Sequence, residues 1–431
     1  MKKKVRQSSF LIFFIILFMT FGIQTVFSAQ TGDRGEDLTI KIAVAGAGAE
    51  LYFWWGHIAL VIENNRTGQS NFYDYGIFSF DREKFFINFA MGRLWYSSAV
   101  TPSYSNIAVY KYSNRPVTIY TLDIPPIKRE EILDFAETSV LPENRDYLYH
   151  HFRDNCTGPI LKILDIATDG QFHEKMSEEP GRFTQRQHIR RHTWFSPFID
   201  WALSFFMGQD IDTPITAWEE LFLPSEVASQ IKKFEYTDSN GKYHPLVKDT
   251  EIVYESNIRP MALEIPHKQW PRELIFGLSV SLLLIIFYLI QAKFTACGQI
   301  MLGISHSLIG LFFGGAGLVL FFLSFFTSHD YTYHNINLLF CNPLLLIAFP
   351  AGIKYASSDN YNKRLKHELT LRILWLIVLL GIIISMLLNL TPYFWQETLN
   401  NQLLMLPVVL MLAFEPAGLQ RLLRRLLWRW M

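Results

Sequence analysis

The sequence holds one cysteine in a setting suited to nucleophilic chemistry. Cys156 is flanked by Asn155 and Thr157 and precedes apolar residues 159–167, whose spacing predicts a helix that begins beside the thiol. The positive end of a helix dipole and its free N–H groups stabilise a thiolate and can hold an oxyanion. We therefore expect Cys156 to be a nucleophile, with Asn155 and Thr157 next to the substrate.

A thiol nucleophile needs a base, and His57 is the first candidate. It follows Trp-Trp-Gly within an aromatic run, residues 51–62, that passes into β-branched residues and predicts a strand. His150 and His151 are rival bases because they lie close to Cys156 along the chain. A histidine on a strand that faces the helix has the better geometry, although such a residue can also be an ordinary core histidine.

A third group that orients the imidazole is expected from the neighbouring strand. Asp74, in Tyr-Asp-Tyr-Gly, is the candidate, and the adjacent Tyr75 is expected to contact substrate. The remaining predicted elements are those of an α+β fold. They comprise strands at 40–45, 71–76, 107–112 and 117–124, and helices at 128–140, 184–192 and 197–207.

Composition divides the chain into parts. Of 431 residues, 50% are hydrophobic and 18% charged, and the apolar residues are concentrated beyond residue 270. Net charge is zero with no basic block, which excludes nucleic acid as a partner. A basic start followed by an apolar core predicts a signal peptide over 1–29. We expect an exported thiol catalytic domain at 30–176, an aromatic and basic connecting region at 177–270, and a transmembrane domain at 271–431.

Five apolar segments are expected in the transmembrane domain, and four of them are long enough to cross a bilayer. Lys and Arg are concentrated in alternate connections, so the positive-inside rule places the soluble part outside and the C-terminus in the cytoplasm. Only Cys156 lies in the exported part, because Cys297 and Cys341 fall in the apolar half. The exported domain therefore cannot close an internal disulfide.

The outer connection after the second segment is unusually polar. It supports two interpretations of equal weight: a lining for lipid substrate, or helix capping and a proline-related adjustment of the backbone. His188 and His192, at helical spacing in the connecting region, have no third ligand and are interpreted as surface residues, with no metal site. The candidate substrate-binding residues of the connection and the helix that follows are His329, His334, Asn335, Asn337 and Asn342.

A string of motifs resembles a known family. In order, the chain carries Trp54-Trp-Gly-His57-Ile-Ala-Leu, Tyr73-Asp-Tyr-Gly76, Phe85–Gly92, Pro142-Glu-Asn-Arg-Asp-Tyr147 and Asp154-Asn-Cys156-Thr. This order resembles the Lnb N-terminal periplasmic domain family. The His-before-Cys order is similar to permuted NlpC and lecithin:retinol acyltransferase-like thiol enzymes, which implies a permuted papain-like fold before a five-helix transmembrane domain. Their third residue is usually a histidine, whereas this region offers Gln69 or Asp74.

The resemblance implies a lipoprotein N-acyltransferase that works through a Cys156 thioester in the bacterial inner membrane. The acyl donor would be the diacylglyceryl group of the lipoprotein itself, although a phospholipid donor fits the residues equally well. No cofactor is implied. Two alternatives remain: a membrane-tethered cysteine peptidase or amidase that acts on cell-wall peptides, and a non-enzymatic envelope assembly factor.

Overall fold

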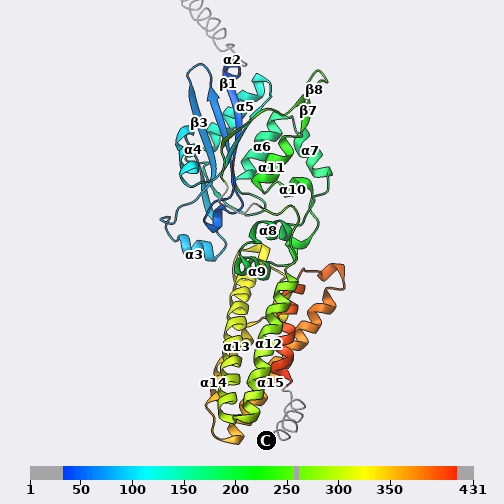
Figure 1. Cartoon of the computed structure of the whole chain (residues 1–431). Helices are drawn as coiled ribbons and strands as arrows, with labels where there is room; N and C mark the ends of the chain where they lie inside the picture. Colours follow the sequence, from blue (N-terminus) through cyan, green and yellow to red (C-terminus); the bar gives the residue numbers. More distant parts are fainter. Residues whose placement is uncertain (1–32, 257–261, 415–431) are drawn as a thin grey trace, which may run out of the picture.

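The computed structural model describes residues 33–256 and 262–414. The expected signal peptide and the basic C-terminal tail lie outside these residues. An antiparallel sheet of seven strands dominates the first part, in the order β6-β4-β3-β2-β1-β5-β9 (Figure 1). Its strands are β1 (Leu38–Ala45), β2 (His57–Asn64), β3 (Gln69–Ile77), β4 (Trp95–Pro102), β5 (Val117–Leu122), β6 (Asp146–Leu148) and β9 (Val247–Tyr254).

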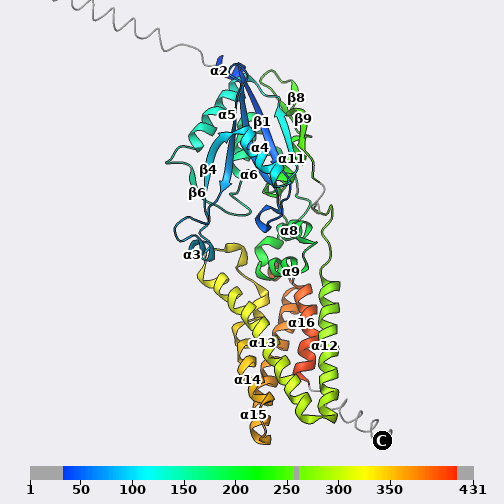
Figure 2. The same cartoon turned by 60° about the vertical axis from the view of Figure 1, so that its left-hand side comes forward.

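Helices cover both faces of this sheet. Ile58 and Leu60 of β2 point to the larger core, which includes residues of α5 (Pro126–Ser139), α6 (Thr157–Ala167) and α11 (Pro224–Ile231). Ala59 and Val61 alternate to the other face and pack with Tyr110 of α4 (Ser103–Tyr112). Figure 2 shows α4 in front of the sheet and α6 behind it. The α+β class is confirmed.

Two sequence predictions about these elements were wrong. Residues 107–112 are part of α4 and not a strand, because Tyr110 alone enters the core whereas Tyr112 is 94% exposed. Residues Leu51–Phe53 form a short 3-10 helix, η1, so the strand begins only at His57. Alternating apolar residues in a short segment cannot by themselves separate these possibilities.

The first domain does not end at residue 176, where we had predicted its boundary. Strand β9 pairs with β5 along the edge of the sheet, and Val227 of α11 is fully buried in the main core. His188 and His192, predicted to be surface residues, are 0% and 7% exposed. The connecting region therefore completes the sheet domain. Its other elements are α7 (Gln171–Glu178), α8 (Gln185–Thr193), α9 (Pro197–Phe206), η2 (Gln209–Asp212), α10 (Ala217–Glu220) and the hairpin β7 (Glu235–Thr237) and β8 (Tyr243–Pro245).

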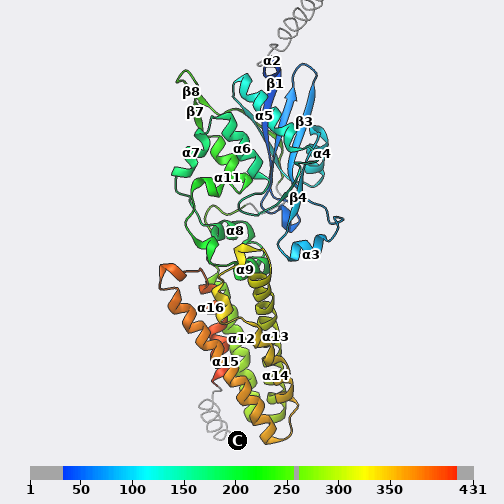
Figure 3. The same cartoon turned by 180° about the vertical axis from the view of Figure 1, so that it is seen from behind.

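The second part is a helical bundle in which four helical stretches are long and apolar enough to cross a membrane: Trp270–Lys293, Thr295–Phe326, Ile336–Ala356 and Tyr361–Leu388. The helix Leu399–Ala413 is shorter. Figures 1 and 3 show the sheet domain stacked on one end of this bundle, with α8 and α9 between them. Its elements are α12 (Trp270–Lys293), α13 (Thr295–Phe326), η3 (Asp330–Thr332), η4 (Ile336–Leu339), η5 (Pro343–Ile347), α14 (Ala348–Ala356), α15 (Tyr361–Leu388), η6 (Pro392–Phe394) and α16 (Leu399–Ala413).

A buried arginine joins the two parts. Arg186 of α8 is 1% exposed and pairs with Asp212, from Nε to Oδ1 at 2.6 Å and from Nη2 to Oδ2 at 2.9 Å. It also donates to the carbonyl oxygens of Ser204, Met207 and Gly208. Asp212 in turn accepts from the N–H of Glu397, which belongs to the loop before α16. Through Asp212, this guanidinium links the end of α9 to the loop before α16.

Candidate functional site

His57 and Asp74 lie on one face of the sheet and share a hydrogen bond. His57 begins β2, Asp74 lies on β3 opposite Ala59, and His57 Nε2 is 2.6 Å from Asp74 Oδ1. Both side chains are largely shielded, at 16% and 17% exposed. Since Nε2 is engaged by the carboxylate, Nδ1 is the ring nitrogen left to exchange a proton with a nucleophile.

The surroundings favour the charged form of this imidazole. Burial opposes the imidazolium, but Tyr110, Asp74 and Cys156 outweigh it and hold the pKa of His57 well above 6.5. Cys156 is among the groups that raise this pKa, which indicates that its thiol lies near the imidazole.

Cys156 is the N-terminal cap of α6 and is 7% exposed. Asn155 fixes its position: the Asn155 side chain donates to the carbonyl oxygens of His151 and Phe222, and its oxygen accepts from the N–H and hydroxyl of Thr157, all within 2.8–2.9 Å. Asn155 and Thr157, predicted to contact substrate, are thus both buried, and they hydrogen-bond to each other. They hold the loop that carries Cys156 in place.

The thiol lies near the end of the sheet at which His57 begins β2. Cys156 belongs to the core on the α6 face, whereas His57 and Asp74 belong to the α4 face. The register of β2 with β3, continued by two residues, sets Gly76 across from His57. Gly76 has φ +88°, and a Cβ at this position would lie 3.4 Å from the Cβ of Cys156. Because Gly76 has no side chain, space remains at this point between the two faces of the sheet.

Two side chains that sequence reasoning missed complete this environment. The hydroxyl of Tyr147 lies 3.7 Å from the same Cβ position at Gly76, and it is buried with no hydrogen-bond partner within residues 33–256 and 262–414. Burial, with Cys156, Asp154 and Asp74, raises the pKa of Tyr147, so its proton is retained for donation. Arg115, 2% exposed, lies over the rings of Phe53 and Tyr110. The one sequence signal for Tyr147 was its place at the end of a family-like motif.

The rival histidines have other partners. His150 Nε2 is 2.9 Å from Asp330 Oδ1, and its Nδ1 accepts from two backbone N–H groups. Arg153 also pairs with Asp330, at 2.8 Å, so a residue of the membrane part clamps the loop before the thiol. Burial, with His150 and His329, lowers the pKa of His151 to about 4. His57 therefore remains the base best placed for Cys156.

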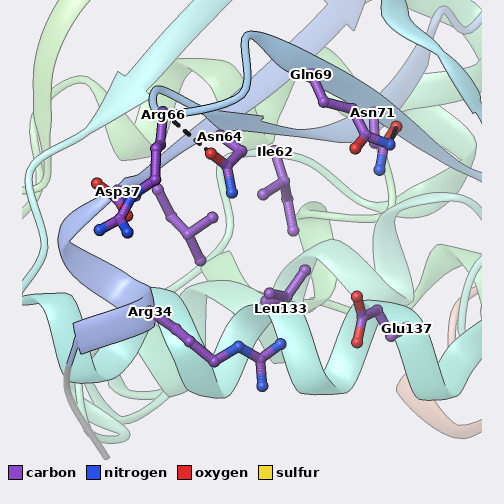
Figure 4. A pocket seen from close by; sticks show the side chains of 10 residues that line it. Arg34, Asp37, Ile62, Asn64, Arg66, Gln69, Asn71, Leu133 and Glu137 are labelled. Atoms are coloured by element: carbon purple, nitrogen blue, oxygen red, sulfur yellow. Dashed lines mark hydrogen bonds and ion pairs between the residues drawn. The ribbon is translucent and has the colours of Figure 1, made fainter. Parts of the chain in front are cut away.

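Gln69, the alternative third residue, lies at the far end of β3. It pairs with Asn64 there and lines a polar cavity of about 600 Å³ (Figure 4). This cavity contains no cysteine or histidine. Tyr75, a predicted substrate contact, is fully buried in the main core, where its hydroxyl meets Ser139 at 3.2 Å. Gln69 is therefore far from His57, the Tyr75 hydroxyl is already paired, and Asp74 is the third group that the geometry supports.

Most side chains of the polar outer connection make structural hydrogen bonds. Asn335 and Asn337 are buried and donate to the carbonyl oxygen of Phe205, at 2.9 and 3.0 Å. Asn342 caps η5 by accepting from the N–H of Leu344. His329 is 7% exposed and bonds Phe89 and Tyr331. His334 alone is open, with a side chain that is 73% exposed. Helix capping and contacts with other elements thus explain most of these polar residues without a contact to substrate.

Taken together, the fold and the site define a class: a membrane protein whose α+β domain presents a cysteine at a helix start beside a histidine–aspartate pair. Within the described residues, no group of three His, Cys, Asp or Glu side chains is arranged to hold a metal ion. The Lnb N-terminal periplasmic domain matches residues 11–191, and the Lnb transmembrane domain matches residues 272–413. The chain belongs to the Lnb family, as a multi-pass membrane protein with a periplasmic N-terminal domain. No curated protein and no solved structure matches it.

Replacing Asp74 should change how the acylation of Cys156 depends on pH. Without the Asp74 carboxylate, the pKa of His57 should fall, so in Asp74→Asn the alkaline loss of Cys156 acylation should begin at lower pH. The effect on stability has a definite sign. Because the pKa of His57 is raised in the folded protein, its contact with Asp74 stabilises the fold fully below about pH 6.5, and this stabilisation is lost as the pH rises through the folded pKa. Asp74→Asn should therefore destabilise more at mildly acidic than at alkaline pH.

Rates of acylation and unfolding midpoints, both measured against pH, check this prediction. Asp37→Asn is the matched control, because Asp37 lies at the opposite end of the sheet, paired with Arg66. An unchanged pH profile in Asp74→Asn would remove Asp74 from the site.

Proposed function

We propose that this chain is a membrane-bound thiol acyltransferase that N-acylates the terminal cysteine of bacterial lipoproteins. The observation that carries the proposal is the shared environment of Cys156 with the His57–Asp74 pair, at a helix start beside an unpartnered tyrosine hydroxyl. Membership of the Lnb family supports lipoprotein maturation as the setting.

In the first half-reaction, the Cys156 thiolate attacks an ester carbonyl of a membrane-held diacylglyceryl group. The negative charge moves to the carbonyl oxygen, where the Cys156 N–H and the Tyr147 hydroxyl are the donors in reach. The acyl–oxygen bond then breaks, and the imidazolium of His57 gives its proton to the departing glyceryl oxygen. The products are a Cys156 thioester and a lyso glyceryl group.

In the second half-reaction, the neutral α-amine of a lipoprotein's terminal cysteine attacks the thioester. His57, now neutral, takes a proton from this amine while the carbon–nitrogen bond forms. The carbon–sulfur bond breaks and Cys156 leaves as a thiolate, so the original ion pair is restored. An α-amine pKa near 8 leaves a useful neutral fraction at physiological pH.

The membrane part supports this assignment by concentrating both substrates. Lys293 ends α12 and Lys354 lies in the last turn of α14, both at the end of the bundle away from the sheet domain. A cytoplasmic location for that end, with α16 as a fifth span in the inner membrane, sets the thiol beside the outer leaflet. Donor and acceptor are both held there, so a local encounter replaces a bulk one.

One reconstitution tests the reaction and identifies the donor. The full-length protein is placed in vesicles of deuterated phospholipid with an unlabelled diacylglyceryl lipopeptide, and the products are read by mass spectrometry. We expect an N-acyl lyso-lipopeptide with an unlabelled chain. A deuterated N-acyl chain on an intact diacylglyceryl lipopeptide would identify phospholipid as the donor. Unchanged lipopeptide, with cleavage of added muropeptides, would instead indicate the peptidase alternative.

A further inference from the structure

Helix α3 (Phe85–Ala90) and the loop before it form an apolar surface that is largely exposed among residues 33–256 and 262–414. None of its residues is buried. Phe80, Phe86, Ile87 and Phe89 are 55%, 72%, 65% and 48% exposed, and we call these four residues the α3 surface. The rings of Phe80, Phe86 and Phe89 all contact Phe85, with centroids 5.1–6.0 Å apart. Folding leaves this aromatic cluster assembled but uncovered.

Hydrogen bonds fix α3 to the outer end of the bundle. The ring of His329 meets the carbonyl oxygen of Phe89 at 2.9 Å, and the N–H of Ser328 donates to Met91 at 2.9 Å. A Cβ at Gly92, which has φ +73°, would lie 2.7 Å from the backbone of Ser328 and His329, so only glycine permits this approach. The α3 surface is thus held at the level where the spans end.

The surroundings at that level are those of a membrane interface. The outer end of α13 exposes Phe321, Phe322, Phe325 and Phe326, at 38–65%, on the lipid-facing surface of a spanning helix. Figures 1 and 3 show α3 to one side of the upper end of α13, at about the level of α9. Exposed aromatic side chains at the end of a span are typical of the interfacial belt of membrane proteins.

We propose that the α3 surface inserts into the outer leaflet of the membrane. Continuity with the lipid-facing end of α13 identifies lipid as the occupant, because a patch at this height and to the side of the bundle meets bilayer in the assembled membrane protein.

Aromatic contacts continue from this surface to the thiol. Phe85 stacks on Phe78 at 6.1 Å, Phe78 contacts Tyr96 at 5.4 Å, and Tyr96 stacks on Tyr149 at 4.1 Å. Tyr149 lies 3.5 Å from the Cβ position of Gly76, beside Cys156. Resting on the proposed function, this path gives α3 a second role: it guides an acyl chain from the leaflet to the nucleophile.

Spin labels test the insertion without any need for activity. Ile87→Cys, Tyr112→Cys and Phe325→Cys are labelled singly in the full-length chain carrying Cys156→Ala and Cys297→Ala, and reconstituted in phosphatidylcholine–phosphatidylglycerol vesicles. Residue 112 is the aqueous reference, and residue 325 is the lipid reference. We expect the label at 87 to be relaxed more by oxygen than by a water-soluble nickel chelate, as at 325. Equal behaviour at 87 and 112 would overturn the proposal, as would protection from both reagents.

A second measurement tests the acyl path. The double variant Phe86→Ser/Ile87→Ser, with its cysteines intact, should transfer acyl chains from vesicle-held lipopeptide about tenfold more slowly while acting normally on a water-soluble short-chain ester. An unchanged rate on vesicles would refute the path. If labels report insertion but the wild-type protein transfers no acyl chain, the proposed function fails and the lipid contact stands.

Discussion

Cys156→Ala should abolish acyl transfer. No other nucleophile in the site can form the thioester, so N-acylation of lipoproteins should fall by at least about 10³-fold, as when a catalytic nucleophile is removed from other acyl-transfer enzymes. The variant should fold, because Ala removes a single sulfur atom from a buried cap position and introduces no polar or larger group. Mass spectrometry of lipoprotein N-terminal peptides, from cells whose only copy is the variant, measures the loss.

Cys297→Ala is the matched control, since Cys297 is an exposed thiol in the membrane part, and it should retain full activity. A thioester-trapping acyl probe should label the wild type and Cys297→Ala but not Cys156→Ala. Normal N-acylation in Cys156→Ala would exclude the thiol mechanism and favour a non-enzymatic assembly role.

Arg186→Met should cause the largest loss of stability among single changes outside the site. The substitution leaves Asp212 buried without its partner and frees the carbonyl oxygens at the end of α9. Breaking a buried ion pair from one side costs about 3–5 kcal/mol. We therefore expect a markedly lower unfolding midpoint for the full-length protein in detergent, followed by tryptophan fluorescence.

Two further variants separate burial from loss of charge. Arg66→Met breaks an arginine–aspartate contact of 2.6 Å in which the arginine side chain is 71% exposed, so it should cost less than about 1 kcal/mol. Adding Asp212→Leu to Arg186→Met should recover part of the loss, because no lone charge then remains buried. Equal destabilisation by Arg186→Met and Arg66→Met would show that the Arg186 contact does not join the two parts.

The sequence alone identified the Lnb family and the α+β class. Cys156, His57 and Asp74 could be proposed because residue type and local pattern were informative: cap residues before an apolar run mark a helix start, and alternation marks the strands. Local patterns carry no information about pairing partners far along the chain. For this reason β9, which begins 125 residues after β5 ends and pairs with it at the edge of the sheet, was assigned to a connecting region.

The burial of several polar residues was also predicted wrongly from the sequence. His188 was interpreted as a surface residue because no third metal ligand accompanied it, yet its Nε2 bonds Glu220 at 2.8 Å and its Nδ1 bonds Arg191 at 2.9 Å. Asn335 and Asn337 were proposed for substrate because polar residues close to the membrane are often functional. In each case the partner is supplied by a different element, so only the folded chain shows that the group is already satisfied.

The clamp of Asp330 on His150 and Arg153 has a consequence for biogenesis. The loop that presents the thiol depends on a residue that follows the second spanning helix, so export of the sheet domain alone leaves this loop without its support. We therefore expect the thiol to become reactive only after the helices have inserted and assembled in the membrane.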